Sequence, residues 1–324
     1  MTKADMVSTR HKTVLLQETI DGLNLNTKSI VLDCTFGGGG HSLEICKRYP
    51  GVKIIALDQD KSVFERAENK FKDLGCDITF LNTNFRNLGN LKNFGAFALG
   101  EKVDAIIFDL GLSSDQLESS GRGFSFLRDE PLLMTMKENP SPEDVTAYDV
   151  LNTWGEDSLA DIIYGYGEEK QARRIAKAIV DFREKEEIKT TFDLVGIIEK
   201  AIPARFRKGH AKGRASKIHY ATKTFQAIRI AVNDELGALS EGLEKGFELL
   251  KTNGRMAVIS FHSLEDRIVK RFYKTKENEG KAKLISARNE FHSGGNKKVI
   301  LANDNEIKNN GRARSAKLRI LSRR

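Results

Sequence analysis

The sequence predicts an α/β fold, in which a doubly wound, mostly parallel sheet carries an inserted helical domain. Short apolar runs alternate with amphipathic helical patterns over the first 112 residues. Helical patterns without a clear buried strand follow, and strand patterns return after residue 221. Strands that alternate with helices form parallel sheets through right-handed crossovers. We therefore expect residues 1–112 and 221–324 to form a sheet domain and residues 113–220 to form the inserted helical domain.

Four short apolar runs in the first part match buried parallel strands, which are covered on both faces. They span 29–34, 53–57, 77–81 and 103–108. Helices are expected at 41–48 and 61–74. The second helix has an apolar stripe at helical spacing, which indicates core packing. The members of this stripe are Val63, Phe64, Ala67, Phe71 and Leu74.

The middle and last parts of the chain have different patterns. The middle part has helical patterns at 143–152, 156–164, 172–183 and 192–201. One long helix is expected from 221 to 250, because the turn residues Asn253 and Gly254 follow it. Strands at 255–261 and 317–321 and a helix at 264–274 complete the sheet domain, and the polar segment 276–310 is expected to be rich in loops.

A run of four glycines, Gly37 to Gly40, follows the first strand and precedes the first expected helix. Glycine lets a backbone approach a ligand closely, and the N–H groups of the next helix turn toward that ligand. The flanking strands end in Asp33 and Asp58, and Asp58 lies 21 residues past Gly37, near the spacing of a carboxylate that binds ribose hydroxyls. These features predict a nucleoside-containing cofactor at the carboxyl edge of the sheet.

The spacing of the glycines distinguishes between cofactors. A dinucleotide fingerprint that starts at Gly37 requires glycine at position 42, where this chain has Ser42. The pattern Asp33-x-x-x-Gly37-x-Gly39 instead resembles the first motif of S-adenosylmethionine-dependent methyltransferases, with Thr35 in place of their usual first glycine. The glycine run therefore favours S-adenosylmethionine over a nicotinamide dinucleotide.

Composition restricts the class of protein. The chain has 324 residues, of which 40% are hydrophobic and 30% charged, as in globular proteins that bury a large core. No apolar run has the length of a membrane span, and the first residues lack the apolar core of a signal peptide, so we expect a cytoplasmic protein without membrane attachment. The three cysteines, Cys34, Cys46 and Cys76, form no CxxC pair, so neither a disulfide nor a metal site is expected.

The net charge of +8 is concentrated in two segments. Residues 203–229 contain eight Lys or Arg and no Asp or Glu, and residues 307–324 contain seven and none. For the terminal segment we favour a solubilising tail. For 203–229 we favour nucleic-acid binding over a solvated face, because aromatic rings able to stack on unpaired bases lie between the charges. These rings are Phe206, His219, Tyr220 and Phe225.

Six stretches carry a resemblance to a known family. They are HKTVLL at 11–16, FDLGLSSDQL at 108–117, RGFSF at 122–126, ATKTFQAIRI at 221–230, SFHSLEDR at 260–267 and RARS at 312–315. With these motifs in this order, the chain closely resembles the bacterial small-subunit ribosomal RNA cytosine-N4 methyltransferases. The resemblance runs from about residue 11 to residue 320 and is weakest across 276–306.

The resemblance implies a fold, a reaction and a partner. It implies a Rossmann-like class I methyltransferase sheet and the transfer of a methyl group from S-adenosyl-L-methionine to the N4 amine of a cytidine in 16S ribosomal RNA. The partner would be 16S ribosomal RNA or the small ribosomal subunit. Two alternatives stay open: a DNA amino-methyltransferase, whose Pro-Pro loop is missing after Asp109, and an RNA-binding assembly factor without catalysis, against which the intact glycine run argues.

The family's cofactor-binding residues, carried over one by one, fall on Gly39, Gly40, His41, Asp58, Phe85, Asp109 and Gln116. In this interpretation the glycines admit the methionine end, Asp58 binds the ribose and Phe85 covers the adenine. Asp109 is the catalytic candidate, because a carboxylate that accepts an N–H bond orients a weakly nucleophilic amine. A role for Asp109 in cofactor binding alone is an equal alternative, with the backbone of 110–113 as acceptor.

The chain departs from the family at three positions. Leu133 and Thr135 replace an Asp and an Arg in the loop 131–136, and Cys34 stands where Gly is frequent. No substrate contact is therefore assigned to this loop. His262, in the stretch SFHSLEDR, ends a strand at the same edge of the sheet, and we expect it to fix the local loop.

Overall fold

The computed structural model describes residues 12–94, 101–204, 219–285 and 298–324. The chain divides into two compact units, one formed by 1–111 and 238–324 and the other by 112–237. The second boundary lies at 237/238, whereas the sequence placed it at 220/221. Helix α10 (Thr222–Asn233) belongs to the second unit because its Phe225 and Ile228 are buried in that unit's hydrophobic core.

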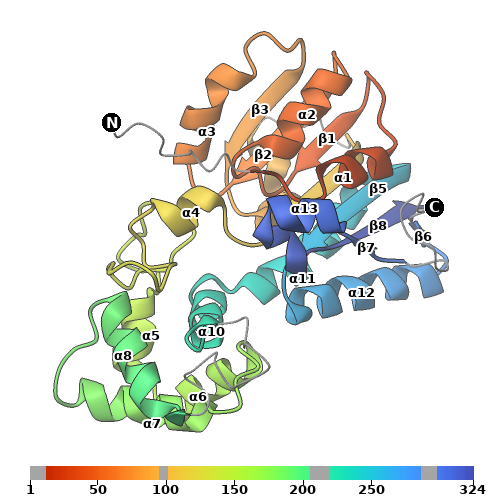
Figure 1. The fold of residues 1–324 in the computed structure, drawn as a ribbon. Coiled ribbons are helices and arrows are strands. Elements are labelled where there is room, and N and C mark those ends of the chain that lie inside the picture. The colour runs from red at the N-terminus through yellow and green to blue at the C-terminus, as the bar shows by residue number, and fades with distance from the viewer. Residues whose placement is uncertain (1–11, 95–100, 205–218, 286–297) are drawn as a thin grey trace. The chain divides into compact units, whose positions relative to one another are not determined.

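The first unit is built on one sheet, in which the described residues form eight strands in the order β3-β2-β1-β4-β5-β8-β6, with β7 paired to β8 (Figure 1). Strands β1 to β5 are parallel, and β8 is antiparallel to its neighbours. The strands are β1 Ile30–Asp33, β2 Lys53–Asp58, β3 Asp77–Asn82, β4 Val103–Asp109, β5 Leu250–Ser260, β6 Ala282–Ile285, β7 Ile300–Leu301 and β8 Lys317–Arg323. The predicted doubly wound, mostly parallel sheet is confirmed.

Helices cover both faces of this sheet (Figure 1). Successive strand residues point to opposite faces: Val31 lies in a core with α1, α2 and α3, whereas Leu32 lies in a core with α11 and α12. The helical segments of this unit are α1 Leu16–Leu23, α2 Gly40–Arg48, α3 Ser62–Ala67, η1 Glu68–Lys70, η2 Phe85–Phe94, α11 Glu235–Leu249, α12 Ser263–Asn278, α13 Asp304–Asn309 and η3 Gly311–Ser315. Both faces are apolar, as expected for buried parallel strands.

The chain changes direction across the sheet between β1 and β4. From β1 it proceeds through β2 to β3 on one side, and from β4 through β5 to β8 on the other. Ligands of open α/β sheets bind at such a switch point, beyond the carboxyl ends of the strands. Asp33 and Asp109 end these two adjacent strands and therefore stand at the switch point.

Three expected elements differ from the structure. The expected helix 61–74 ends at Ala67 and continues as the 3-10 turn η1, although its apolar stripe still packs into the core. The expected helix 221–250 is two helices, α10 and α11, because Asp234 adopts a left-handed conformation (φ 44°) that ends the first one. The segment 276–310 contains the end of α12 as well as β6, β7 and α13.

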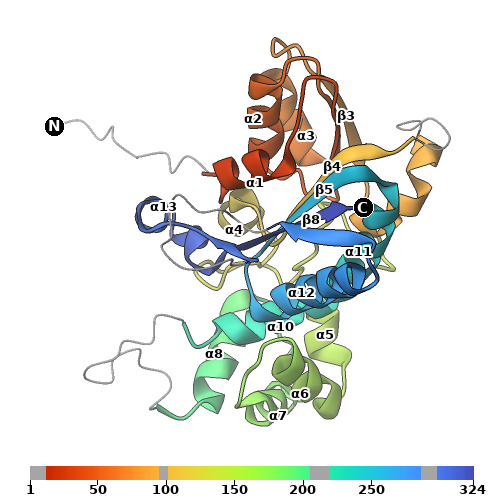
Figure 2. The ribbon, with the colours of Figure 1, turned by 90° about the vertical axis from the view of Figure 1, so that its right-hand side faces the viewer.

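The second unit is helical (Figure 2). Its helices are α4 Ser114–Glu118, α5 Ala147–Thr153, α6 Glu156–Gly165, α7 Ala172–Arg183, α8 Thr191–Ala201 and α10. Capping boxes at Thr146 and Thr190 start α5 and α8 by satisfying backbone N–H groups. Of the residues that the structure describes here, only Pro131 and Thr190 pair as a β-bridge. None of the helices described in either unit combines the length and apolar character of a membrane span.

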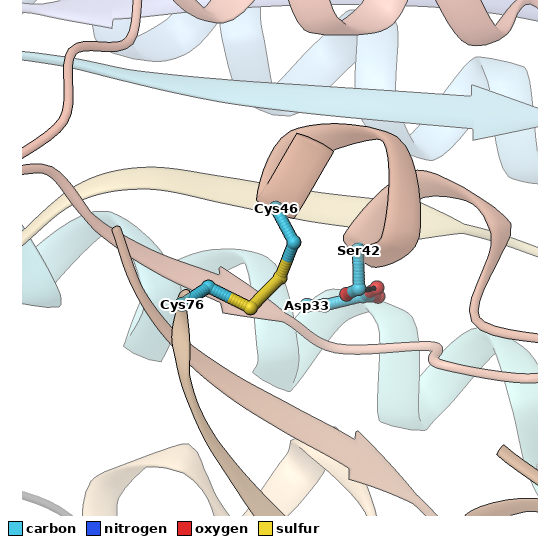
Figure 3. Close-up of a disulfide and its surroundings, with 4 residues drawn as sticks. All are labelled: Asp33, Ser42, Cys46 and Cys76. Carbon is cyan, nitrogen blue, oxygen red and sulfur yellow. Dashed lines mark hydrogen bonds between the residues drawn. A yellow bond between two sulfur atoms is a disulfide. The ribbon is translucent and has the colours of Figure 1, made fainter. Parts of the chain in front are cut away.

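Cys46 and Cys76 form a disulfide, so the prediction of no disulfide is wrong (Figure 3). Their Cα atoms lie 5.4 Å apart, although 30 residues separate them in sequence. The crossover through α2 returns the chain to β2, and the Gly51 N–H then donates to the Gly75 carbonyl at 2.8 Å. This contact brings the end of α2 next to the residue before β3, which no local spacing indicates. Cys34 is a free, buried thiol, as expected.

Candidate functional site

The glycine turn at the end of β1 is fixed by its own packing. The Phe36 N–H donates to the Leu57 carbonyl at 2.9 Å, which holds the turn against β2. Gly39 has φ +74°, and a Cβ there would approach the Phe36 ring to 2.6 Å. A Cβ on Gly40 would collide with the Thr13 hydroxyl. Both glycines are therefore required by the protein's own contacts, and the turn leads directly into the N-terminus of α2.

Asp58, at the end of β2, accepts one hydrogen bond from this turn and one from the residues that follow β2. Its Oδ2 accepts the Gly37 N–H at 2.8 Å, and its Oδ1 accepts the Asp60 N–H at 2.9 Å. Burial raises the pKa of Asp58 to about 6, against the lowering effect of these two bonds. Each carboxylate oxygen keeps a further lone pair. Asp58 can therefore accept two hydroxyl groups, as the binding of a ribose requires.

Asp33, at the end of β1, is a buried carboxyl that makes hydrogen bonds within the site. Its Oδ2 accepts the Ser42 hydroxyl at 2.6 Å, and its Oδ1 accepts the Thr35 N–H at 3.2 Å. Figure 3 shows the two side chains pointing toward each other from β1 and α2. Burial raises the pKa of Asp33 to about 6. Thr35, in place of the usual glycine, also accepts the Asp109 N–H on its Oγ1 at 2.6 Å, so it joins the ends of β1 and β4.

Asp109 has the least satisfied carboxyl of this group. Its Oδ1 is buried and has no hydrogen-bond partner among the described residues, while the whole side chain keeps 23% of its surface exposed. Its Oδ2 lies 3.6 Å from Nδ1 of His41, which is 4% exposed near the start of α2. The pKa of Asp109 is raised to about 8, mainly by burial and also by the charges of Asp33 and Glu265, against a lowering effect of Arg312.

These contacts bring five of the seven expected cofactor residues into one edge of the first unit: Gly39, Gly40, His41, Asp58 and Asp109. Phe85 lies in the same unit, with its ring edge-on to Phe108 at 5.4 Å and against α11, where a Cβ on Gly242 would meet it at 2.7 Å. The Phe85 ring is only half-buried, so part of it can contact a ligand.

Gln116 belongs to the second unit. Its Oε1 accepts the Ser113 N–H at 2.8 Å, and its own N–H donates to the Ser113 hydroxyl at 3.1 Å. This capping box starts helix α4. The contacts of Gln116 thus explain its burial without a ligand.

Two other sequence motifs have structural roles. His262 caps α12, and Glu265 accepts the N–H groups of Phe261 and His262 at 2.8 and 3.2 Å, so His262 fixes its loop as expected. In the second unit, the buried Arg122 donates to the carbonyls of Thr135 and Met136 at 3.1 and 2.9 Å. The loop 131–136 is held through its backbone, which explains why its side chains can depart from the family.

The aromatic residues of the basic segment divide into buried and accessible rings. The basic stretch 205–218, with Phe206, lies outside the described residues. Phe225 is 4% exposed in the helical core, so its expected stacking on bases is wrong. The His219 ring stacks on Phe126 at 4.5 Å and lies 4.1 Å from the Tyr220 ring. His219 is exposed, so this ring cluster is open to solvent at the end of the basic stretch.

The family of this chain follows from a comparison of its sequence with models of known protein families. The model described as the MraW methylase family matches residues 8–324. The chain belongs to the MraW methylase family. It is the same family that the six sequence motifs indicate. The predicted family is therefore confirmed, and the use of S-adenosylmethionine is confirmed with it. This member of the MraW family is therefore an S-adenosylmethionine-dependent ribosomal RNA methyltransferase.

Solved structures of other methyltransferases are similar to this chain. A putative rRNA-methylase from Clostridium thermocellum has 11% identity and a TM-score of 0.43, over 97% of this chain and 98% of that one. An rRNA methylase from Streptococcus thermophilus has 11% identity and a TM-score of 0.41, over 92% and 89%. A putative methyltransferase from Streptococcus mutans has 10% identity and a TM-score of 0.42, over 97% and 99%. Similarity at this level assigns no residue of the site.

The residues present fit S-adenosylmethionine. The orphaned Oδ1 of Asp109 and the open acceptor positions of Asp58 are polar groups that a ligand can satisfy. Negative carboxyl groups also match a cofactor that carries a sulfonium charge. Among the described residues, no group of three or more His, Cys, Asp or Glu is arranged to hold a metal ion.

Four residues around the site have no role assigned from the sequence: Thr13, Asp33, Ser42 and Glu265. Asp33 alone had a usable signal, because it ends a strand next to the switch point. The others reach the site through the tertiary fold: Thr13 contacts Gly40, and Glu265 acts on Asp109 from α12. Arg312, in the RARS motif, lowers the pKa of the same Asp109 carboxyl. The sequence alone assigns no role to this motif.

Proposed function

We propose that this enzyme transfers the methyl group of S-adenosylmethionine to the N4 amine of a cytidine in 16S ribosomal RNA. The single observation that supports this assignment most is Asp109, a carboxyl with an unsatisfied buried oxygen at the end of β4, beside the glycine turn. In this proposal, that oxygen is the acceptor for the exocyclic amine. The family membership supports an RNA substrate. The six sequence motifs, SFHSLEDR among them, support the assignment to the N4 amine through their resemblance to the cytosine-N4 methyltransferases.

Each expected site residue has a proposed task. Asp58 accepts the ribose hydroxyls, and Phe85 contacts the adenine. Gly39, Gly40 and His41 form the turn and the first helical residues against which the methionine end lies. Gln116 is the remaining cofactor-binding residue that the family resemblance implies, in addition to its capping role at the start of α4. In the same proposal, the first compact unit binds the cofactor and the second binds the substrate.

The reaction requires that the N4 amine be oriented toward the methyl group, and it does not require a strong base. When bound, S-adenosylmethionine supplies an electrophilic methyl group on a sulfonium centre. The N4 lone pair of cytosine is delocalised into the ring, so an acceptor for an N4–H bond helps to localise it and to direct it. Asp109 supplies this acceptor. If Asp109 serves only the cofactor, the carbonyls of residues 110–113 are the alternative acceptors.

The proposed partner is 16S ribosomal RNA, either free or within the small ribosomal subunit, and we place the reaction in the cytoplasm with this substrate. The exposed His219 ring and the basic residues that precede it support contact with unpaired nucleotides. The DNA amino-methyltransferase alternative is disfavoured, because Leu110, Gly111 and Leu112 follow Asp109 where that class has Pro-Pro. An assembly factor without catalysis is disfavoured by the complete turn and the carboxyl groups around it.

Mass mapping of modified nucleotides tests the proposal. Small-subunit RNA from cells without the enzyme is treated with the purified protein and S-adenosylmethionine, then digested and analysed for N4-methylcytidine. We expect one new methyl group on a cytidine N4. It should form far more slowly with Asp109→Asn and at the normal rate with Asp77→Asn, which changes an exposed carboxylate at the opposite end of the sheet. Methylation of another base, or of a ring carbon, would overturn the assignment.

A further inference from the structure

Two acidic side chains act on the carboxyl group of Asp109. The charges of Asp33 at the end of β1 and Glu265 on α12 both act on its carboxyl, and the positive charge of Arg312 in η3 opposes them. His41 of α2 faces it at 3.6 Å. His262, which caps α12, lies 3.1 Å from Glu265. Asp33 and Glu265 are themselves buried, with 2% and 3% of their surface exposed.

Carboxylates that share a poorly solvated site cannot all remain ionised, so one of them retains a proton. The hydrogen bonds decide which one. Asp33 accepts a hydroxyl and a backbone N–H, and Glu265 accepts two backbone N–H groups. Such bonds favour the charged form. Asp109 has a buried Oδ1 without any donor among the described residues, so its charged form is the least stabilised.

We propose that Asp109 carries a proton in the free enzyme, that binding of the cationic methyl donor releases this proton to solvent, and that the resulting carboxylate then takes the proton lost by the N4 amine. The pKa of about 8 for Asp109 agrees with this arrangement of groups. The last part of the inference rests on the proposed function, whereas the proton release on cofactor binding does not.

The proposed cycle balances in atoms and charge. On binding, Asp109 changes from a neutral acid to a carboxylate, and one proton leaves to the buffer. In the transfer, the N4 lone pair forms the new N–C bond, the electron pair of the broken S–C bond stays on sulfur, and the N4 proton passes to Asp109. The buried site thus holds a carboxylate while the sulfur is cationic and a neutral acid once the sulfur is neutral. Asp109 is left protonated, as in the free enzyme.

Calorimetry measures the released proton without any turnover. S-adenosylmethionine is titrated into the free enzyme near pH 7 in buffers of different ionisation enthalpy, and the dependence of the observed heat on that enthalpy gives the number of protons. A group with a pKa of about 8 is roughly 90% protonated near pH 7, so we expect release of about 0.9 proton. Asp33 and Asp58, with pKa values of about 6, are mostly ionised there and contribute little.

Two variants and three further measurements keep the inference falsifiable. Asp109→Asn should reduce the number of protons released to the small contribution of Asp33 and Asp58. Asp77→Asn should leave this number unchanged. S-adenosylhomocysteine, which lacks the sulfonium charge, should release less. In difference infrared spectra, S-adenosylmethionine should remove a protonated carboxyl band from the wild type. If Asp109→Asn does not fold, the wild-type release should still fall by about half between pH 7 and pH 8.

Release near zero in the wild type, or full release in a folded Asp109→Asn variant, would overturn the inference. These results are independent of the mass mapping: N4-methylcytidine formed by an enzyme that releases no proton on binding would leave the proposed function in place and remove only the proton cycle.

Discussion

At the scale of single residues, the ionisation of Asp109 links the folding of this protein to pH. The pKa of Asp109 is about 8 in the folded chain, against an ordinary value of 3.8 for an aspartate. Between these values the unfolded chain loses the proton and the folded chain keeps it, so the free energy of unfolding falls as pH rises, by at most about 1.4 kcal/mol per pH unit. Below about pH 4, Asp109 is protonated in both the folded and the unfolded chain, so it no longer changes the free energy of unfolding.

Asp109→Asn removes this titration, so its free energy of unfolding relative to wild type should rise between pH 5 and pH 8 and level off above. Asp33 and Asp58 titrate in both proteins, and their effects cancel in the comparison. Urea unfolding at a series of pH values measures the difference. A difference that is constant with pH would show that Asp109 is ionised in the folded chain throughout.

Asp58 is the residue whose replacement should weaken the cofactor most directly. Asp58→Ala removes charge-assisted hydrogen bonds to the ribose, each of which contributes about 1.5–3 kcal/mol, so calorimetry should give a Kd raised by about 10-fold or more. The same change frees the Gly37 N–H, so Asp58→Asn, which keeps one carbonyl oxygen, is the matched variant. Unchanged affinity in the folded Ala variant would exclude Asp58 from the ribose site.

At the scale of elements, the Cys46–Cys76 disulfide ties α2 to the start of β3. It closes a segment of 30 residues, for which loop-closure entropy predicts a stabilisation of about 3–4 kcal/mol. Cys76→Ser should therefore lower the free energy of unfolding by this order relative to the oxidised wild type. Disulfides are uncommon in the cytoplasm, so alkylation and mass measurement of protein isolated from cells is the accompanying control. A wild type equally stable with and without reductant would contradict the effect.

The elements also show what local sequence patterns can and cannot predict. The strands β1 to β4 lie within one residue of their predicted ends, because a buried strand is a short apolar run whatever surrounds it. The break between α10 and α11 was missed, because both flanking segments are helical in pattern and Asp234 alone changes the backbone. The disulfide and the Asp33–Ser42 bond depend on how α2 packs over the sheet, which no spacing in the sequence contains.

At the scale of the whole molecule, the site depends on segments from both ends of the chain. The Leu15 N–H donates to Glu306 at 2.7 Å across 291 residues, and the Asn310 side chain donates to the Lys12 carbonyl at 2.8 Å. Thr13 and Arg312 belong to these segments, so the first and last motifs meet beside the glycine turn and Asp109. The sequence showed both motifs, but only the fold brings them together.

The uneven charge of the chain predicts how it binds RNA. Lys208, Lys212, Arg214 and Lys217 lie in the basic stretch outside the described residues, and each phosphate that they neutralise releases counterions. Changing all four to Glu should weaken RNA binding, flatten its salt dependence and leave S-adenosylmethionine affinity unchanged. The matched control reverses four exposed lysines of the first unit, Lys28, Lys61, Lys70 and Lys72. Equal loss in both variants would indicate a general charge effect.

The catalytic role of Asp109 is tested most directly by the rate of a single methyl transfer by Asp109→Asn, with RNA and S-adenosylmethionine both saturating. Mass spectrometry of N4-methylcytidine measures this rate. If Asp109 accepts the N4–H bond, the rate should fall on the order of 100-fold or more, because the lost contact matters most in the transition state. Saturation compensates for any loss of binding. A rate restored to that of the wild type would remove Asp109 from the chemistry and leave the backbone of 110–113 as the acceptor.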